Sequence, residues 1–284
     1  WWVTEAVPIY VTGLIPIVLF PFFNIFDIQD ISSSYAHPLV LLFLGGFIIA
    51  SAMESCGLHK RIAINILSFS GTSPAMIVAG FMITTALISM WVSNTASTIM
   101  MLPIATSVIA IFSSQKQSKE NDLTIPLLLA IAYSASIGGV ATLIGTPTNV
   151  MLASILSDNY NYNLGFFDWF KIGFPITLIL LPVVWFFLTN IIFKLSKNKS
   201  NALQVTISGL KKDIGKSSFA EKIVAIVFLL TALLWILRRF INNNFDLNIN
   251  DTSIGLFGAL LLFIIPIKKN KRACSWETAS KIPW

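Results

Sequence analysis

Two long stretches of this chain contain no charged residue, and they constrain its fold more than any other feature of the sequence. Residues 62–115 and residues 123–157 lack Asp, Glu, Lys and Arg altogether. One membrane crossing needs about 20 apolar residues, so the first stretch must cross the bilayer, or enter it and return, more than once. Only 11% of the chain is charged, against roughly a quarter in a soluble domain. We therefore predict an all-α polytopic membrane protein.

The apolar residues fall into separate runs, which predict the helices of such a protein. Each run is bounded by polar, Pro or Gly residues, as expected where a helix ends. The runs lie at about residues 6–26, 38–55, 62–70, 74–92, 96–113, 123–143, 148–157, 172–193, 220–237 and 253–267.

The distribution of Lys and Arg predicts which loops face the cytoplasm, because basic residues accumulate on that side of a membrane protein. The residues predicted inside are Lys60, Arg61, Lys116, Lys119 and the basic residues of 194–222 and 268–272. Residues 159–169 and 242–246 then form outer loops. Arg238 and Arg239 depart from the rule at an outer helix end.

The first uncharged stretch begins and ends on the same side, which leaves two arrangements open. It forms either two full crossings, or a short interfacial helix followed by a re-entrant hairpin. Its most polar point, Ser93-Asn94-Thr95, favours the hairpin with these residues at the tip. Ser89 lies four residues before Ser93, so the two hydroxyls should share a face of the helix leading to the tip. Asn94 tolerates the left-handed conformation of a turn, and Thr95 is the predicted N-cap of the next helix.

The second uncharged stretch is interrupted at residues 144–150, Ile-Gly-Thr-Pro-Thr-Asn-Val. Gly145 permits a bend, and Pro147 cannot donate to a helical ladder. Thr146 as N-cap with Pro147 in the first helical position favours a helix start. A helix from about residue 123 is therefore predicted to end near Gly145, and a half-helix to begin at Thr146.

Both interruptions suggest the same chemistry. A helix N-terminus at membrane depth presents unpaired N–H groups and partial positive charge, which suit an oxyanion. Neighbouring hydroxyl, amide and carbonyl oxygens suit a hard cation such as sodium, and no Asp or Glu lies near either break. Broken helices flanking a central site recur in transporters. The alternative interpretations are ordinary hydrogen bonding between membrane helices and an ordinary proline kink.

Three segments in this order resemble the divalent anion:sodium symporter family, the sodium–dicarboxylate cotransporters. They are WWVTEAVP at residues 1–8, MWVSNTASTIMMLPIA at 90–105 and GGVATLIGTPTNVML at 138–152. The resemblance implies a homodimer in the lipid bilayer, in which a transport domain moves past a static scaffold as an elevator. It implies Ser89, Ser93, Asn94 and Gly145 as sodium ligands. It implies Asn94, Thr95 and Thr146 as contacts to the substrate carboxylate.

The resemblance also implies that this chain is one half of an inverted-repeat elevator transporter, with a re-entrant helical hairpin and a broken transmembrane helix. Its second repeat would follow Trp284. The implied division is scaffold-type helices at 1–61, an interfacial helix and the hairpin at 62–115, the broken helix and the next helix at 116–193, a cytoplasmic connector at 194–219 and further scaffold-type helices at 220–284.

The expected function is sodium-coupled symport of a small divalent anion across the plasma membrane. C4-dicarboxylates such as succinate or malate are preferred on family frequency alone, because citrate and sulfate present similar oxyanions. Sodium is the coupling ion, and no organic cofactor or nucleic-acid partner is expected. One alternative is a sodium-independent anion exchanger of the same fold. Another is a membrane-embedded enzyme, which His37 and His59, predicted at the surface near membrane borders, do not support without a nucleophile motif.

Overall fold

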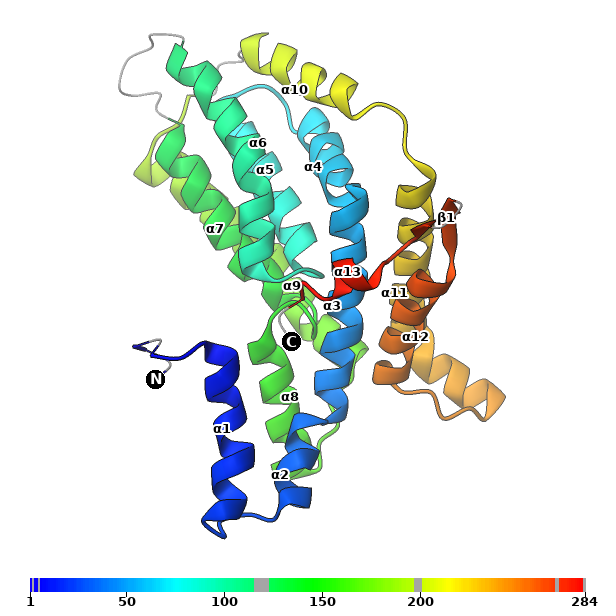
Figure 1. Cartoon of the computed structure of the whole chain (residues 1–284). Helices are drawn as coiled ribbons and strands as arrows, with labels where there is room; N and C mark the ends of the chain where they lie inside the picture. Colours follow the sequence, from blue (N-terminus) through cyan, green and yellow to red (C-terminus); the bar gives the residue numbers. More distant parts are fainter. Residues whose placement is uncertain (2, 5, 115–122, 197–200, 269–270, 283–284) are drawn as a thin grey trace.

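The computed structural model describes residues 1, 3–4, 6–114, 123–196, 201–268 and 271–282, and this part of the chain is mostly helical (Figure 1). The predictions for Lys116, Lys119, Lys197, Lys199 and the boundary at 115–116 fall outside these residues. The helices are α1 (Ile9–Phe22), α2 (Ile28–Tyr35), α3 (Pro38–Cys56), α4 (Leu58–Phe69), α5 (Pro74–Ser89), α6 (Asn94–Ser114), α7 (Thr124–Val140), α8 (Pro147–Tyr160), α9 (Phe166–Phe186) with its π-helical end η2 (Phe187–Ile192), α10 (Asn201–Ile214), α11 (Phe219–Phe245), α12 (Asp251–Ile264) and α13 (Trp276–Ala279).

Two elements depart from the expected pattern. Strands β1 (Pro266–Lys268) and β2 (Lys271–Arg272) pair antiparallel, so the described chain is mainly but not wholly helical. The predicted cytoplasmic connector contains the helix α10. That helix has a polar sequence with apolar residues on one side, a pattern of period 3.6 that the uncharged runs do not reveal.

Local sequence explains where the helices begin and end. Helix α3 ends at Gly57, whose φ of 80° is the left-handed conformation that turns the chain directly into α4. Helix α11 begins with a capping box, in which Ser218 Oγ accepts from the Glu221 N–H and a Glu221 carboxylate oxygen accepts from the Ser218 N–H. The same carboxylate lies 2.9 Å from Arg61 Nε. This ion pair ties α4 to the start of α11.

Three helical segments are long and apolar enough to cross a membrane: Ile28–Cys56, Phe166–Ile192 and Phe219–Phe245. Helices α5 and α6 run antiparallel and are joined by residues 90–93 (Figure 1). The 16 residues of α5 extend about 24 Å at 1.5 Å per residue, which is short of a hydrocarbon layer of about 30 Å. Helix α6 has 21 residues, which is long enough to cross, so the re-entrant hairpin stays a prediction that rests on the short α5 and the polar tip.

The buried apolar residues form three cores. The first core joins α4, α5, α6, α7 and η2, with Ile77, Phe81, Met101, Leu127 and Leu188 among its members. The second core joins α3, α11 and α12, with Ile49, Met53, Val227 and Leu262. The third core lies between these groups and includes Leu42, Leu143, Val150, Phe166 and Trp235.

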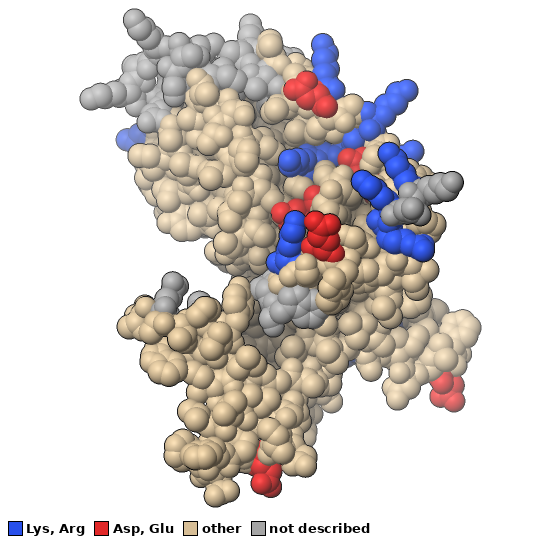
Figure 2. Space-filling view, viewed as in Figure 1, with Lys and Arg blue, Asp and Glu red and all other residues tan. Residues whose placement is uncertain are grey.

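Basic side chains gather at one end of the molecule, around α4, α10 and the β1–β2 hairpin (Figure 2). This is the end that the basic loops predict to be cytoplasmic. At the other end Arg238 lies 3.1 Å from Asp251, and Arg239 lies 2.6 Å from Asp168. The two arginines that depart from the charge rule are therefore paired with carboxylates from α12 and α9.

The first outer loop is shorter than predicted, and the second lies further along the chain, at residues 246–250. Helix α9 begins at Phe166, inside the predicted loop 159–169, and α11 continues to Phe245, through the predicted loop 242–246. Asn242 explains the second difference, because its amide accepts from the Ile249 N–H at 3.1 Å and donates to the Ile249 carbonyl at 2.8 Å. These bonds hold the next segment against the polar last turn of α11.

The prediction of a surface position is wrong for His59. Its side chain is buried, and Nδ1 lies 3.3 Å from the Met53 carbonyl oxygen. Burial lowers the pKa of His59, because a charged imidazolium is disfavoured away from water. His37 remains partly exposed, with Nε2 3.6 Å from Asp158 Oδ1.

Gly138 sets the separation of α5 and α7. A Cβ at this position would lie 2.5 Å from the Ala86 Cα and 2.8 Å from its carbonyl carbon. We expect Gly138→Ala to force the helices apart and destabilise the protein by about 1–3 kcal/mol. Thermal unfolding in detergent checks this. Gly209→Ala is the matched control, because its Cβ meets nothing within 4 Å; equal melting temperatures of the two variants would refute the argument.

Candidate functional site

The hairpin tip is a short turn between two helices. Helix α5 ends at Ser89, residues 90–93 turn the chain, and α6 begins at Asn94. Ser93 Oγ accepts from the Ala96 N–H at 3.3 Å, so Ser93 caps α6 and the prediction of Thr95 as N-cap is wrong. Ser93 also lies beyond α5, so it does not share a helix face with Ser89. Asn94 takes part in α6 and is not left-handed.

Ser89 and Asn94 meet across this turn. Ser89 is fully buried, and its Oγ lies 2.8 Å from Asn94 Oδ1 and 2.7 Å from the Ala135 carbonyl oxygen of α7. A hydroxyl has one hydrogen to donate, so Ser89 satisfies only one of two facing oxygens unless the Asn94 amide presents its nitrogen instead. Three neutral oxygens from α5, α6 and α7 thus converge at one buried point.

The broken helix lies directly against this tip. Helix α7 ends at Val140, earlier than predicted, and α8 begins at Pro147 with Thr146 as its N-cap, as predicted. The Thr142 hydroxyl donates to the Met90 carbonyl in the turn of the hairpin. Residues 141–146 are therefore packed in protein, as non-helical backbone at membrane depth requires.

Asn149 satisfies the backbone groups that this break frees. It is buried, and its Nδ2 donates to the carbonyl oxygens of Gly139 and Thr142, each at 2.8 Å. The amide therefore holds the start of α8 against the end of α7. Asn149 lies in the interrupted segment, but the residue pattern alone does not assign it this role. An amide in an apolar half-helix was the available signal.

Gly139 connects the two halves of the site. A Cβ on Gly139 would collide with Asn94 Oδ1, and a Cβ on Gly145 would collide with the Gly139 carbonyl oxygen. Both residues therefore serve close approach. Ser89, Asn94 and Gly145, three of the predicted sodium ligands, are thus brought into one cluster through Gly139.

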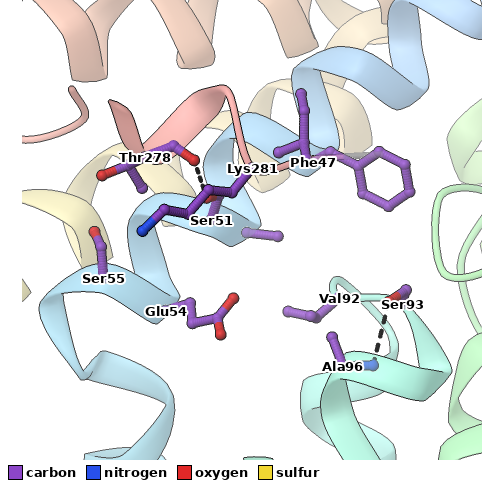
Figure 3. A pocket seen from close by; sticks show the side chains of 11 residues that line it. Phe47, Ser51, Glu54, Ser55, Val92, Ser93, Ala96, Thr278 and Lys281 are labelled. Carbon is purple, nitrogen blue, oxygen red and sulfur yellow. Dashed lines mark hydrogen bonds between the residues drawn. The ribbon is translucent and has the colours of Figure 1, made fainter. Parts of the chain in front are cut away.

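The other predicted residues lie at the edge of the cluster. Ser93 lines a cavity of about 410 Å³ together with Ser51 and Glu54 of α3 and Lys281 (Figure 3). Thr95 is exposed at the first turn of α6. Thr146 is half-buried, and its hydroxyl lies 3.4 Å from that of Thr148 and makes no cap bond to its own helix. Thr95 is thus open to a ligand, and the Thr146 hydroxyl is held only by the neighbouring exposed Thr148 hydroxyl.

The chemistry of the cluster is that of neutral oxygen. The hydrogen-bond partners of Ser89, Asn94 and Asn149 within the described residues are all uncharged. Hydroxyl, amide and carbonyl oxygens are ligands for hard cations, which favour oxygen over nitrogen and sulfur. The first turns of α6 and α8 add N–H groups and partial positive charge beside them.

Comparison with known proteins shows what the whole of this chain is similar to. The profile of the citrate transporter family matches residues 1–284. The sodium-dependent dicarboxylate transporter SdcS of Staphylococcus aureus strain USA300 is 38% identical over all of this chain and 56% of its own length. SdcS of strain COL is 37% identical over the same shares. The chain thus spans 56% of the length of these relatives.

Asn149 provides a test of the geometry. Asn149→Leu leaves two buried carbonyls without their donor, and we expect a loss of about 1–3 kcal/mol in stability, measured by thermal unfolding in detergent. Asn149→Asp should destabilise at least as much, because a carboxylate cannot donate to the carbonyls. Asn244→Leu is the control, since the Asn244 amide is exposed and bonds within its own helix. If the melting temperature of Asn149→Leu equals that of Asn244→Leu, the Asn149 bonds do not stabilise the break between α7 and α8.

Proposed function

The chain belongs to the citrate transporter family, whose members are transporters rather than enzymes, and from this premise we propose that its protein imports a small divalent anion together with sodium. C4-dicarboxylates such as succinate or malate are the proposed substrates. The protein is placed in the plasma membrane, and the family resemblance is the basis for proposing a homodimer in the bilayer. SdcS is a sodium-dependent dicarboxylate transporter by name, which supports both the ion and the class of anion.

The observation that carries this proposal is the convergence of Ser89 Oγ, Asn94 Oδ1 and the Ala135 carbonyl oxygen. The Ser89 oxygen lies within 2.8 Å of each of the other two. With the amide oxygen of Asn94 facing Ser89, one hydroxyl hydrogen cannot satisfy both acceptors, and a small cation among the three oxygens would. Sodium suits such neutral ligands. The hydrogen-bond partners of these oxygens within the described residues are uncharged, although Glu54 of α3 lines the cavity beside Ser93. We assign Ser89, Ser93, Asn94 and Gly145 to sodium.

The anion is proposed to bind next to the ion, at the first turns of α6 and α8. Asn94, Thr95 and Thr146 are assigned to its carboxylates, because the two threonine hydroxyls make no cap bond and lie at positive helix ends. Sodium at Asn94 would add a full positive charge one residue from Thr95. Ion binding would therefore order the tip first and raise its affinity for the anion.

The division of the apolar cores supports the elevator mechanism that we propose. The first core unites the hairpin with α7 and η2, and the second unites α3 with α11 and α12. A group of helices with a core of its own can move as a body. In this proposal the hairpin, α7, α8 and α9 carry the site past α3, α11 and α12, following the implied division into a moving part at 62–193 and scaffold-type helices at 1–61 and 220–284.

Asn94 gives the direct test. The full-length protein is reconstituted in proteoliposomes, and sodium-dependent succinate uptake is measured. We expect Asn94→Ala to lower uptake at subsaturating sodium at least about tenfold, because the amide oxygen serves both ligands; tenfold is ~1.4 kcal/mol. Asn65→Ala is the matched control, on the exposed side of α4. Near-normal uptake by Asn94→Ala would count against the assignment. Uptake that persists when choline replaces sodium would favour an anion exchanger.

A further inference from the structure

The hairpin tip is held from outside by a stack of aromatic rings. Trp91, two residues before Ser93, stacks on Phe166 of α9 at 5.9 Å between ring centroids and on Trp235 of α11 at 6.4 Å, with interplanar angles of 23° and 8°. Phe166 and Trp235 also stack on each other at 4.5 Å, and the edge of Phe228 meets Trp91 at 4.7 Å. Phe166 and Trp235 are almost fully buried. The turn of the hairpin thus rests on two rings that do not belong to it.

Asp251, in the first turn of α12, fixes both of those rings. Its carboxylate Oδ2 accepts from the Phe166 N–H at 2.8 Å and lies 3.1 Å from Arg238 Nη1. Its backbone carbonyl accepts from the Trp235 indole N–H at 2.9 Å. One residue therefore sets the position of Phe166 through its side chain and the position of Trp235 through its backbone. Arg238 neutralises the buried carboxylate that makes this possible.

We propose that Asp251 and Trp235 are positioning residues for the sodium site, acting on the hairpin tip through Phe166 and Trp91. The inference rests on the proposed sodium binding at Ser89 and Asn94. These two residues stand at either end of the turn that contains Trp91. A displacement of the Trp91 ring therefore moves the two ligands relative to each other.

The effect should fall on sodium more than on the anion. Ion ligands must be held within about 0.5 Å of their working geometry by the packing around them. The Met90 carbonyl, next to Trp91, also accepts from Thr142 in the break, so the same displacement would disturb both halves of the cation site. Of the residues assigned to the anion, Asn94 is shared with sodium, whereas Thr95 and Thr146 have no contact with the stack among the described interactions. Trp91 and Phe166 lie in the segments proposed to move, whereas Trp235 and Asp251 lie in helices proposed to stay in place. The positioning therefore applies to the conformation seen in this structure.

The test separates the ring from its hydrogen bond. Trp235→Phe keeps an aromatic ring and removes the indole N–H, Trp235→Leu removes the stack, and Asp251→Asn weakens the hold on Phe166. In proteoliposomes we expect Trp235→Phe to raise the sodium concentration for half-maximal succinate uptake about fivefold, as the loss of one hydrogen bond does. Trp235→Leu should raise it further. The succinate KM at saturating sodium should stay within about twofold.

A second measurement reports sodium binding without transport. Ala96 lines the cavity beside Ser93, and a cysteine there, with Cys56 and Cys274 replaced by serine, should be protected from a maleimide by sodium. The sodium concentration for half-protection should shift by the same factor as in the uptake assay. Trp185→Phe is the matched control. It also removes an indole–carbonyl bond, 2.8 Å to Ala75 at the base of the hairpin, and should leave both sodium values unchanged.

The outcomes distinguish this inference from the proposed function. If uptake by the unsubstituted protein does not depend on sodium, the proposed function fails. If uptake depends on sodium and the Trp235 and Asp251 variants keep half-saturation within about twofold of it, the positioning role is refuted and the function stands. If Trp235→Leu or Asp251→Asn does not fold, Trp235→Phe alone decides. A purely structural role would lower maximal uptake in the Trp185 and Trp235 variants alike and leave the sodium values in place.

Discussion

The backbone groups freed at the two helix breaks must find partners inside the protein, because hydrocarbon offers none. The structure meets this constraint with side chains from neighbouring elements. The Asn149 amide donates to the Gly139 and Thr142 carbonyls, and the Thr142 hydroxyl donates to the Met90 carbonyl. The Asn149 bonds close the broken helix on itself, and the Thr142 bond joins that break to the hairpin tip. The satisfaction of the broken helix therefore also contributes to the assembly of the site.

The described hydrogen-bond partners of Ser89, Asn94 and Asn149 are uncharged, and this explains how sodium binding and anion binding would be coupled. A carboxylate at Ser89 or Asn94 would attract a cation permanently and repel the anion. Neutral oxygens bind a cation only modestly. When the ion binds, the site changes from uncharged to positive. An oxyanion at the neighbouring helix starts then experiences a large electrostatic difference between the empty and the sodium-bound states. Neutral ligands make the second binding event depend on the first.

The third core carries the contact between the two groups of helices. Phe166 and Trp235 come from α9 and α11, and Asp251 at the start of α12 binds both. The ion pairs of Arg238 with Asp251 and of Arg239 with Asp168 lie at the same place. Charges that the basic loops predict to lie at an outer helix end therefore hold the aromatic rings that pack against the hairpin tip. The departure from the positive-inside rule at Arg238 and Arg239 follows from this.

The sequence by itself determined the long apolar helices, their order and the two interruptions, because these depend on local properties. Hydrocarbon needs long apolar runs, Pro147 and Thr146 favour a helix start, and Ser93 to Thr95 are the most polar residues of their stretch. The helices α2, α10 and α13 fall in none of the predicted apolar runs. It placed Ser89, Asn94 and Gly145 in a common site through the family resemblance. The cap at Ser93, the roles of Asn149 and Thr142, the burial of His59 and the pairing of Arg238 and Arg239 were decided by tertiary structure. Each depends on a contact between residues distant in the chain or on the exact end of a helix, and neither residue type nor periodicity specifies which partner lies within hydrogen-bond distance. The pattern of polar residues indicates which groups need hydrogen-bond partners. Only the packing of α5, α7, α9, α11 and α12 shows which residues those partners are.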